Sequence, residues 1–371
     1  MYHYSDTDIK KVVDTSMNFN NFKDPFNMIL QKKRSIGEPP GTLSYTGLHT
    51  NIGVKIDVIS YDHDWYHRME ITDLESLVVD DRKYWINITG LHDIELIRKI
   101  GDKFGIHHMD LEDVVHVSQR SKIELKEFYL FSVFKMIYLK NEDIHHEHVS
   151  IFVKDQVILT FQEVQGDVFE GIRKRIESGN DRILKRGIEY LYYSIIDAIV
   201  DHYFPVINQS FETFADLEVN VIETGNTDMT RIYQLRKELL YMVNAITPIH
   251  DAILIFTRES NPFFTKEDVP YYADLMDHLT QLGESLKSYR EMINSLYEMQ
   301  MAEKSDALNK TMMTLTTFSV IFIPLSFLAG VFGMNFVHFP GLDYLYAIPL
   351  FVITCITIAA GMLVYFKVKR L

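Results

Sequence analysis

A long uncharged run near the end of the chain carries small and oxygen-bearing side chains at regular intervals. Counting in sevens from Asn309 places two interleaved rows along one side of a helix, and we call these residues the polar stripe: Asn309, Met312, Thr316, Ser319, Ile323, Ser326, Gly330 and Gly333. Hydroxyl and amide oxygens are neutral ligands for a hydrated cation. The stripe therefore suits the wall of an ion path, with Met312, Leu315 and Ile323 as an apolar constriction that closes by dewetting.

The same stripe has a second interpretation. Small residues let membrane helices approach closely, so a row of Gly, Ser and Thr can serve packing alone. Two helices cannot enclose an aqueous path, and an ion path therefore requires several subunits that place the same stripe on a common axis. The sequence alone leaves both interpretations open.

The run that carries the stripe is long enough to cross a membrane. At 1.5 Å per residue, a helix over residues 311–333 exceeds a hydrocarbon core of about 30 Å. A second apolar run at 344–366 predicts a return span. Basic residues flank both spans and are absent from the connection between them, which predicts a multi-pass protein of the cell membrane with both termini in the cytoplasm.

The stretch before the first span predicts one long helix. Residues 265–268 read Thr-Lys-Glu-Asp, a capping pattern, and Pro270 stands near the helix start, where proline is tolerated. Pro324 falls inside the span, and a kink there is tolerated in a membrane helix. We expect the helix to continue from the water-exposed part of the chain to Gly333.

The first half of the chain alternates between strand and helix signals. Period-two patterns predict strands at 52–60, 84–90, 128–138 and 148–163, the last as a hairpin, and helical spacing appears at 91–104 and 110–117. This combination predicts a cytoplasmic α/β or α+β domain. From about residue 181 the strand signal stops, and two helices with a turn at 223–227 predict an antiparallel hairpin, kinked at Pro205 and bent at Pro248.

Several motifs together resemble the CorA family of divalent-cation channels. They are Gly333-Met334-Asn335 within FGMNF, followed by Pro340, at the outer end of the first of two closely spaced spans, and the stretches WINITG, LEDVVHVSQRSKIE and FQE. The resemblance implies a homopentamer in the lipid bilayer that conducts Mg²⁺, with Co²⁺ and Ni²⁺ as further candidate ions. The family's pore positions match at Asn309, Met312, Leu315 and Asn335, and Ile323 and Ser326 are similar replacements.

The resemblance also implies how the ion is selected and how the pore is regulated. Five copies of Asn335 would bind the water shell of Mg²⁺ through amide oxygens. Intracellular Mg²⁺ would bind between neighbouring subunits through Asp113, with Glu112 adjacent, and Asp274. One position departs from the family, which often has an acid two residues after the asparagine, where this chain has Val337.

The expected organisation follows from these elements. We expect a lead-in at 1–48, an α/β domain at 49–180, a helical hairpin at 181–264 and a stalk helix at 265–310. These are followed by a pore-lining span at 311–333, an external loop at 334–343, a second span at 344–366 and a basic tail at 367–371.

Composition excludes several other functions. A net charge of −14 argues against a nucleic-acid partner, and the single cysteine, Cys355, excludes a multi-cysteine metal site. The sequence has no phosphate-binding loop, nucleophile elbow or zinc-ligand pattern, so we expect no enzyme and no ATP-driven transport.

Two rival functions and two minor clusters stay open. The rivals are a zinc transporter of the same superfamily and a membrane-anchored regulator whose spans only tether a ligand-binding domain. His145, His146 and His148 are expected as exposed loop histidines rather than a metal site. Asp197, Asp201 and His202 are expected as a polar patch at a helix contact.

Overall fold

The computed structural model describes residues 39–75, 77–179, 182–224, 229–258, 263, 265–334 and 345–369. Most of the expected lead-in, part of the 223–227 turn, and the loop residues Asn335, Val337 and Pro340 lie outside these ranges. The chain divides into two compact units, Met1–Leu217 with Asp228–Ile293, and Glu218–Thr227 with Asn294–Leu371. Each unit is described by itself.

The first unit is built on a mixed seven-stranded sheet in the order β2-β1-β3-β7-β6-β5-β4. Only β3 and β7 pair in parallel, with Ile86 opposite Leu159. The strands are β1 (Lys55–Asp62), β2 (Trp65–Ile71), β3 (Lys83–Thr89), β4 (Lys122–Leu125), β5 (Leu130–Lys140), β6 (Asp143–Lys154) and β7 (Val157–Gln162). The four strand-forming stretches expected from the sequence are confirmed.

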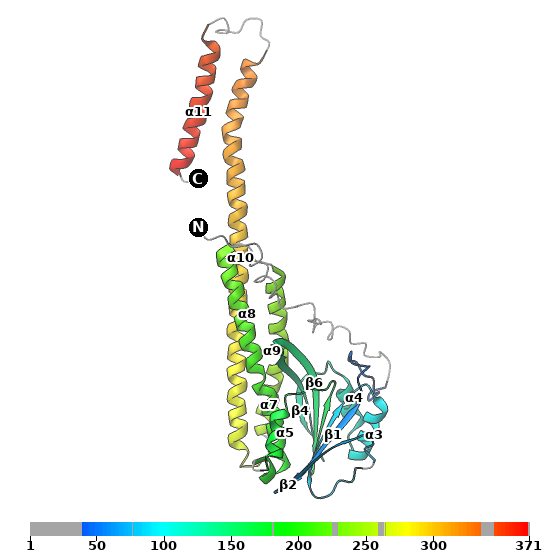
Figure 1. The fold of residues 1–371 in the computed structure, drawn as a ribbon. Coiled ribbons are helices and arrows are strands. Elements are labelled where there is room, and N and C mark those ends of the chain that lie inside the picture. Colours follow the sequence, from blue (N-terminus) through cyan, green and yellow to red (C-terminus); the bar gives the residue numbers. More distant parts are fainter. Residues whose placement is uncertain are drawn as a thin grey trace, which may run out of the picture. The chain divides into compact units, whose positions relative to one another are not determined.

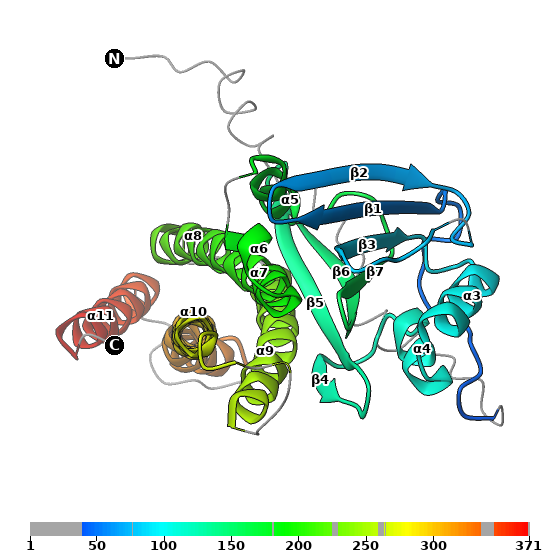
Figure 2. The ribbon, with the colours of Figure 1, turned by 90° about the horizontal axis from the view of Figure 1, so that it is seen from below.

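The central strands are buried on both faces because helices cover both sides of the sheet. Figure 2 places α3 (Ile94–Phe104) and α4 (His108–Val115) on one side, and α5 (Glu170–Glu177), α6 (Arg182–Lys185), α7 (Ile188–Asp201) and α9 (Met229–Arg258) on the other. One set of buried polar groups is paired across β3 and β7: Trp85 Nε1 donates to Thr160 Oγ1 at 3.0 Å, and that hydroxyl donates to Asn87 Oδ1 at 2.6 Å. The expected domain of sheet and helices is confirmed.

The expectation for the histidine cluster was wrong. His145, His146 and His148 lie inside β6 and pair with β5 rather than occupying a loop. His148 is only 1% exposed. Successive strand residues point to opposite faces, so His145 lies on the face away from the other two. Burial, followed by the neighbouring His145, lowers the pKa of His146 to about 3.

The helices after the sheet also differ from expectation in one detail. The first helix stops at Asp201 and α8 (Tyr203–Thr224) begins after His202, so the break precedes Pro205. Pro205 stands in the first turn of α8, where its missing N–H costs little. Pro248 lies inside α9.

The long helix expected before the first span is present as α10 (Val269–Phe332), a single helix of 64 residues with Pro324 inside it. The Asp268 carboxylate receives the Thr265 N–H at 3.0 Å and the Thr265 hydroxyl at 2.5 Å, which fixes the turn that leads into the helix. The capping pattern thus predicted the start of α10.

Among the described residues, three helices are long and apolar enough to cross a membrane: Met229–Arg258, Val269–Phe332 and Ala347–Val368. They differ in burial. In the most apolar window of α9, 44% of residues are buried, and this helix packs beside β4 and β5. The corresponding windows of α10 and α11 (Ala347–Lys369) contain no buried residue. Figure 1 shows α11 beside the later part of α10.

Candidate functional site: an uncovered stripe and clustered acids

The polar stripe lies on a face of α10 that nothing in the described chain covers. All eight of its residues are exposed. The apolar members are among the most exposed, with Met312 at 66% and Ile323 at 67%, and Leu315 at 67% accompanies them. An apolar residue this exposed in a single chain needs either lipid or another protein surface.

A different face of α10 is partly covered. The half-buried residues of this stretch are Thr317, Ile321, Pro324, Leu325, Leu328 and Val331. The second unit contains α11 on this side, where the rings of Phe332 and Phe351 approach to 4.8 Å. At 3.6 residues per turn, the centre of the covered face is about 150° from the centre of the stripe. The stripe is therefore available for contact with water, lipid or another copy of the chain.

The polar groups of the stripe fit a path rather than internal packing. The Ser319 hydroxyl donates to the Leu315 carbonyl of its own helix at 2.9 Å, which keeps its oxygen lone pairs available as acceptors. A side chain added at Gly330 would meet no atom within 4 Å. Nothing among the described residues requires a glycine there, which agrees with a close approach by another copy.

α10 ends immediately before the Gly-Met-Asn motif. The last helical residue is Phe332, and the Gly333 N–H still donates to Ala329 O at 2.9 Å. Met334 is exposed. Asn335 lies outside the described residues, so its contacts are left to experiment.

Two of the acids expected to bind a regulatory ion, Asp113 and Glu112, already have partners within the chain. Asp113 accepts from Gln119 Nε2 at 2.7 Å and pairs with Lys122 Nζ at 2.7 Å. Its pKa is raised, because burial of the carboxyl outweighs the opposing effect of the Lys122 ammonium. Glu112 accepts the Gly41 N–H at 2.7 Å. An ion at Asp113 must therefore compete with an internal cation.

Asp274 is exposed on α10, and no hydrogen bond or ion pair among the described residues joins it to Asp113. Its charge instead acts on α7, where it is one of the causes that raise the pKa of Asp197. The structure thus associates Asp274 with the helices of its own unit.

A three-residue cluster beside Asp274 is the group in the described chain best suited to hold a metal ion. Asp197 and Asp201 from α7 and His278 from α10 bring three potential ligand atoms within 4.8 Å of one another. The imidazole nitrogen is a poor ligand for Mg²⁺, whereas two carboxylates and one imidazole together suit Co²⁺, Ni²⁺ or Zn²⁺. The spacing of the two acids predicted a polar patch on a helix, but His202 is not its third member: the His202 ring lies 2.7 Å from Ala198 O.

The sequence signal for His278 was weak, because an isolated histidine on a long helix is usually a surface residue. Only the packing of α10 against α7 brings it to Asp201, with its Nδ1 atom 3.7 Å from Oδ1. A spacing rule within one helix cannot find such a pair.

Comparison with known proteins identifies relatives over most of the chain. Residues 80–370 match the family model described as CorA-like Mg2+ transporter protein. The cobalt/magnesium transport protein CorA of Thermotoga maritima is 36% identical over 340 residues, which cover 90% of this chain and 97% of that protein. The zinc transport protein ZntB of Pectobacterium atrosepticum is 24% identical over 227 residues, covering 59% of this chain and 66% of its own length.

One solved structure shows the same fold. The CorA magnesium transporter from Methanocaldococcus jannaschii superposes with a TM-score of 0.72 at 22% identity and covers 84% of this chain and 97% of its own.

The cluster yields a prediction in which metal reverses the effect of one substitution. Burial, together with the charge of Asp201, raises the pKa of Asp197. A raised carboxyl pKa favours the folded state at low pH, and this advantage is lost as pH rises from the unfolded-state value through the folded-state value. Asp197→Asn should therefore raise the melting temperature by about 2–4 °C in EDTA at pH 7, and this gain should disappear toward pH 4.

Added Co²⁺ should stabilise the wild type more than Asp197→Asn, because the variant lacks an anionic ligand. Asp102→Asn, at an exposed acid of α3, is the matched control and should change neither value. A lower melting temperature for Asp197→Asn in EDTA, or equal shifts with Co²⁺, would contradict metal binding at this cluster.

Proposed function

This chain belongs to the CorA-like Mg²⁺ transporter family, and from that premise we propose that it is a passive, homopentameric Mg²⁺ channel. Co²⁺ and Ni²⁺ are further candidate ions. The observation that carries the proposal is the polar stripe of α10, exposed on a face about 150° from the face that α11 partly covers. Several copies that turn this face to one axis would enclose a water-filled path.

In the proposed topology, the stripe-bearing part of α10 and α11 cross the membrane. Both termini lie in the cytoplasm, and Gly333, Met334 and Asn335 lie outside. The third apolar helix, α9, stays in water, since it packs beside strands of the first unit. Lipid would cover the bulky side chains on the flanks of α10, among them Phe318, Phe322 and Phe327, which are at least 59% exposed.

Selection in this proposal rests on a ring of Asn335 amides. Mg²⁺ loses its water ligands reluctantly, and a neutral amide oxygen can accept hydrogen bonds from those waters without stripping them. A ring of carboxylates would hold the ion more tightly and release it more slowly. The stripe hydroxyls of Thr316, Ser319 and Ser326 would continue the contact with the hydrated ion along the path.

The driving force is the membrane potential. Moving one charge through 100 mV is worth about 2.3 kcal/mol, and a divalent ion feels about twice that. Inward flux therefore needs no ATP hydrolysis.

Regulation is proposed to use Asp113, with Glu112 adjacent, and Asp274 from neighbouring subunits. Carboxylates that face each other repel, and a bound divalent ion reverses the sign of the interaction. Since Lys122 already pairs with Asp113, the ion must displace an ammonium, which makes the site weak. A weak site is sufficient, because about 1 kcal/mol per subunit over five subunits shifts a two-state equilibrium almost completely.

The first prediction tests the amide ring. In liposomes with purified protein and an inside-negative potential, Asn335→Ala should reduce Mg²⁺ influx at least about tenfold, because hydrogen bonds to the charged, hydrated ion are lost. Asn51→Ala, an exposed asparagine of the first unit, is the matched control. Zn²⁺ influx that survives Asn335→Ala would favour the zinc transporter, and Mg²⁺ influx that is unchanged would contradict the proposed selectivity.

The second prediction tests regulation. Mg²⁺ should protect the wild-type cytoplasmic part from protease, and Asp113→Lys with Asp274→Lys should abolish that protection, because lysines cannot hold the ion. Asp102→Lys with Glu291→Lys is a charge-matched control on exposed positions of α3 and α10.

Since Asp113 is paired inside the chain, Asp274→Asn alone serves as a variant that leaves the Lys122 pair intact. It should raise the Mg²⁺ concentration needed for protection several-fold. Protection that persists unchanged in both variants would remove this mechanism.

A further inference from the structure

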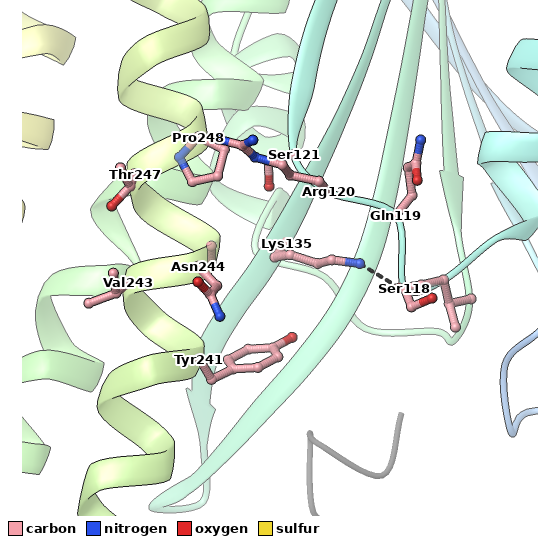
Figure 3. Close-up of a pocket in the computed structure, with 12 residues that line it drawn as sticks. Ser118, Gln119, Arg120, Ser121, Lys135, Tyr241, Val243, Asn244, Thr247 and Pro248 are labelled. Carbon is pink, nitrogen blue, oxygen red and sulfur yellow. Dashed lines mark hydrogen bonds between the residues drawn. The ribbon is translucent and has the colours of Figure 1, made fainter. Parts of the chain in front are cut away.

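One cavity of the first unit is lined by none of the acids discussed above, although its lining residue Gln119 donates to Asp113. It has a volume of about 490 Å³, within the range of small-molecule sites. Residues 117–121 and Lys135 of β5 line one side, and α9 lines the other. Figure 3 shows Tyr241 and Asn244 projecting from α9 toward the loop that carries Ser118 and Gln119.

The charge of this cavity is opposite to that of the protein as a whole. Its twelve lining residues include the cations Arg120 and Lys135 and no carboxylate, although the chain carries a net charge of −14. Lys135 Nζ donates to the Val117 carbonyl and lies 3.4 Å from His148 Nδ1. Burial lowers the pKa of this amine to about 8, against the opposing effect of Glu163. An anion in the cavity would favour the charged ammonium.

Two hydroxyl groups at the cavity wall are left unsatisfied. Ser121 is 3% exposed, and neither its Oγ nor the buried Oγ of Ser118 has a hydrogen-bond partner in the part of the chain that the structure describes. Buried polar groups are nearly always paired, so two such hydroxyls at one cavity indicate a missing partner. Together with the ammonium and guanidinium, they supply donors for the several oxygens of a phosphate group.

The α9 side offers a different kind of surface. Ala245 and Pro248 are buried apolar residues of the wall. Pro248 has no N–H, so the helical hydrogen bond that would reach the Asn244 carbonyl four residues earlier cannot form. The Asn244 carbonyl therefore lacks its usual helical donor, in a wall that also carries an apolar surface and the ring of Tyr241. This half of the cavity suits a planar organic group with a hydrogen-bond donor.

We propose that this cavity binds a small phosphate monoester, with the phosphate at Lys135, Arg120, Ser118 and Ser121 and its organic group against α9. The donors are more numerous than one carboxylate can use, which favours phosphate. This ligand site is independent of the proposed channel, because neither the stripe nor a divalent ion takes part in it.

The test is calorimetric titration of the full-length protein in detergent, with EDTA present so that no divalent ion contributes. AMP is the probe with a planar donor-bearing group, phenyl phosphate is the smaller probe, and adenosine lacks the phosphate. At least one of the two phosphate esters should bind saturably with one site per chain, and adenosine should bind at least tenfold more weakly than AMP.

Two variants locate the site. Arg120→Gln, at an exposed position, should weaken binding about tenfold. Ser121→Ala should weaken binding several-fold while leaving the melting temperature of the ligand-free protein unchanged or higher, since the lost hydroxyl has no partner. Arg98→Gln, an exposed arginine of α3, is the matched control and should bind like the wild type. The proposal is overturned if neither ester binds, if adenosine binds as well as AMP, or if Arg120→Gln and Ser121→Ala leave binding unchanged.

Discussion

Everything in the second unit depends on how an α-helix behaves in a solvent without water. Inside hydrocarbon, backbone groups must be satisfied within the helix, and every polar side chain needs a partner that lipid cannot provide. The later part of α10 meets the first condition as one continuous helix except at Pro324, which has no N–H for the Val320 carbonyl, and the Ser319 hydroxyl donates to its own backbone. It does not meet the second within a single chain, because the stripe is exposed. The proposed assembly around a water-filled axis would meet the second condition, because water would then be the partner of these side chains.

Electrostatics set the corresponding constraint in the first unit. Asp197 and Asp201 are brought together on α7, where burial, followed by the charge of Asp201, raises the pKa of Asp197 and disfavours its charged form. At Asp113 the chain supplies its own cation through Lys122. A bound metal ion would relieve the first arrangement, whereas at Asp113 it would have to replace the Lys122 ammonium. These acids therefore differ in what a divalent ion would do to them, a difference that the spacing of the acids in the sequence does not show.

Regular elements could be predicted from the sequence where one local rule dominates. The start of α10 followed from the Thr265 and Asp268 pattern, and the buried strands from their apolar alternation. β2 was missed because its residues are mostly exposed, so its pairing with β1 rather than its own hydrophobicity makes it a strand. The histidines of β6 were misplaced for the same reason, since polar residues can occupy a strand that neighbouring strands define.

The candidate sites also differ in whether the local sequence could predict them. The stripe lies on one helix, so its period could be found from spacing, and the structure adds only which face remains uncovered. The cluster of Asp197 and His278 and the cavity between Lys135 and α9 join elements that are distant in the sequence. Their existence depends on tertiary packing, which no local period encodes.

The central claim, that the stripe faces water while its flanks face lipid, can be measured by cysteine accessibility. Cys355 is the only cysteine, so a Cys355→Ala background allows single cysteines to be placed at Thr316, Ser319 and Ser326 and, as flank controls, at Phe318 and Phe322. A membrane-impermeant thiol reagent should modify the stripe positions in reconstituted protein at least tenfold faster than the flank positions. Equal rates at both sets, or faster modification of the flank, would contradict a water-filled path along this face of α10.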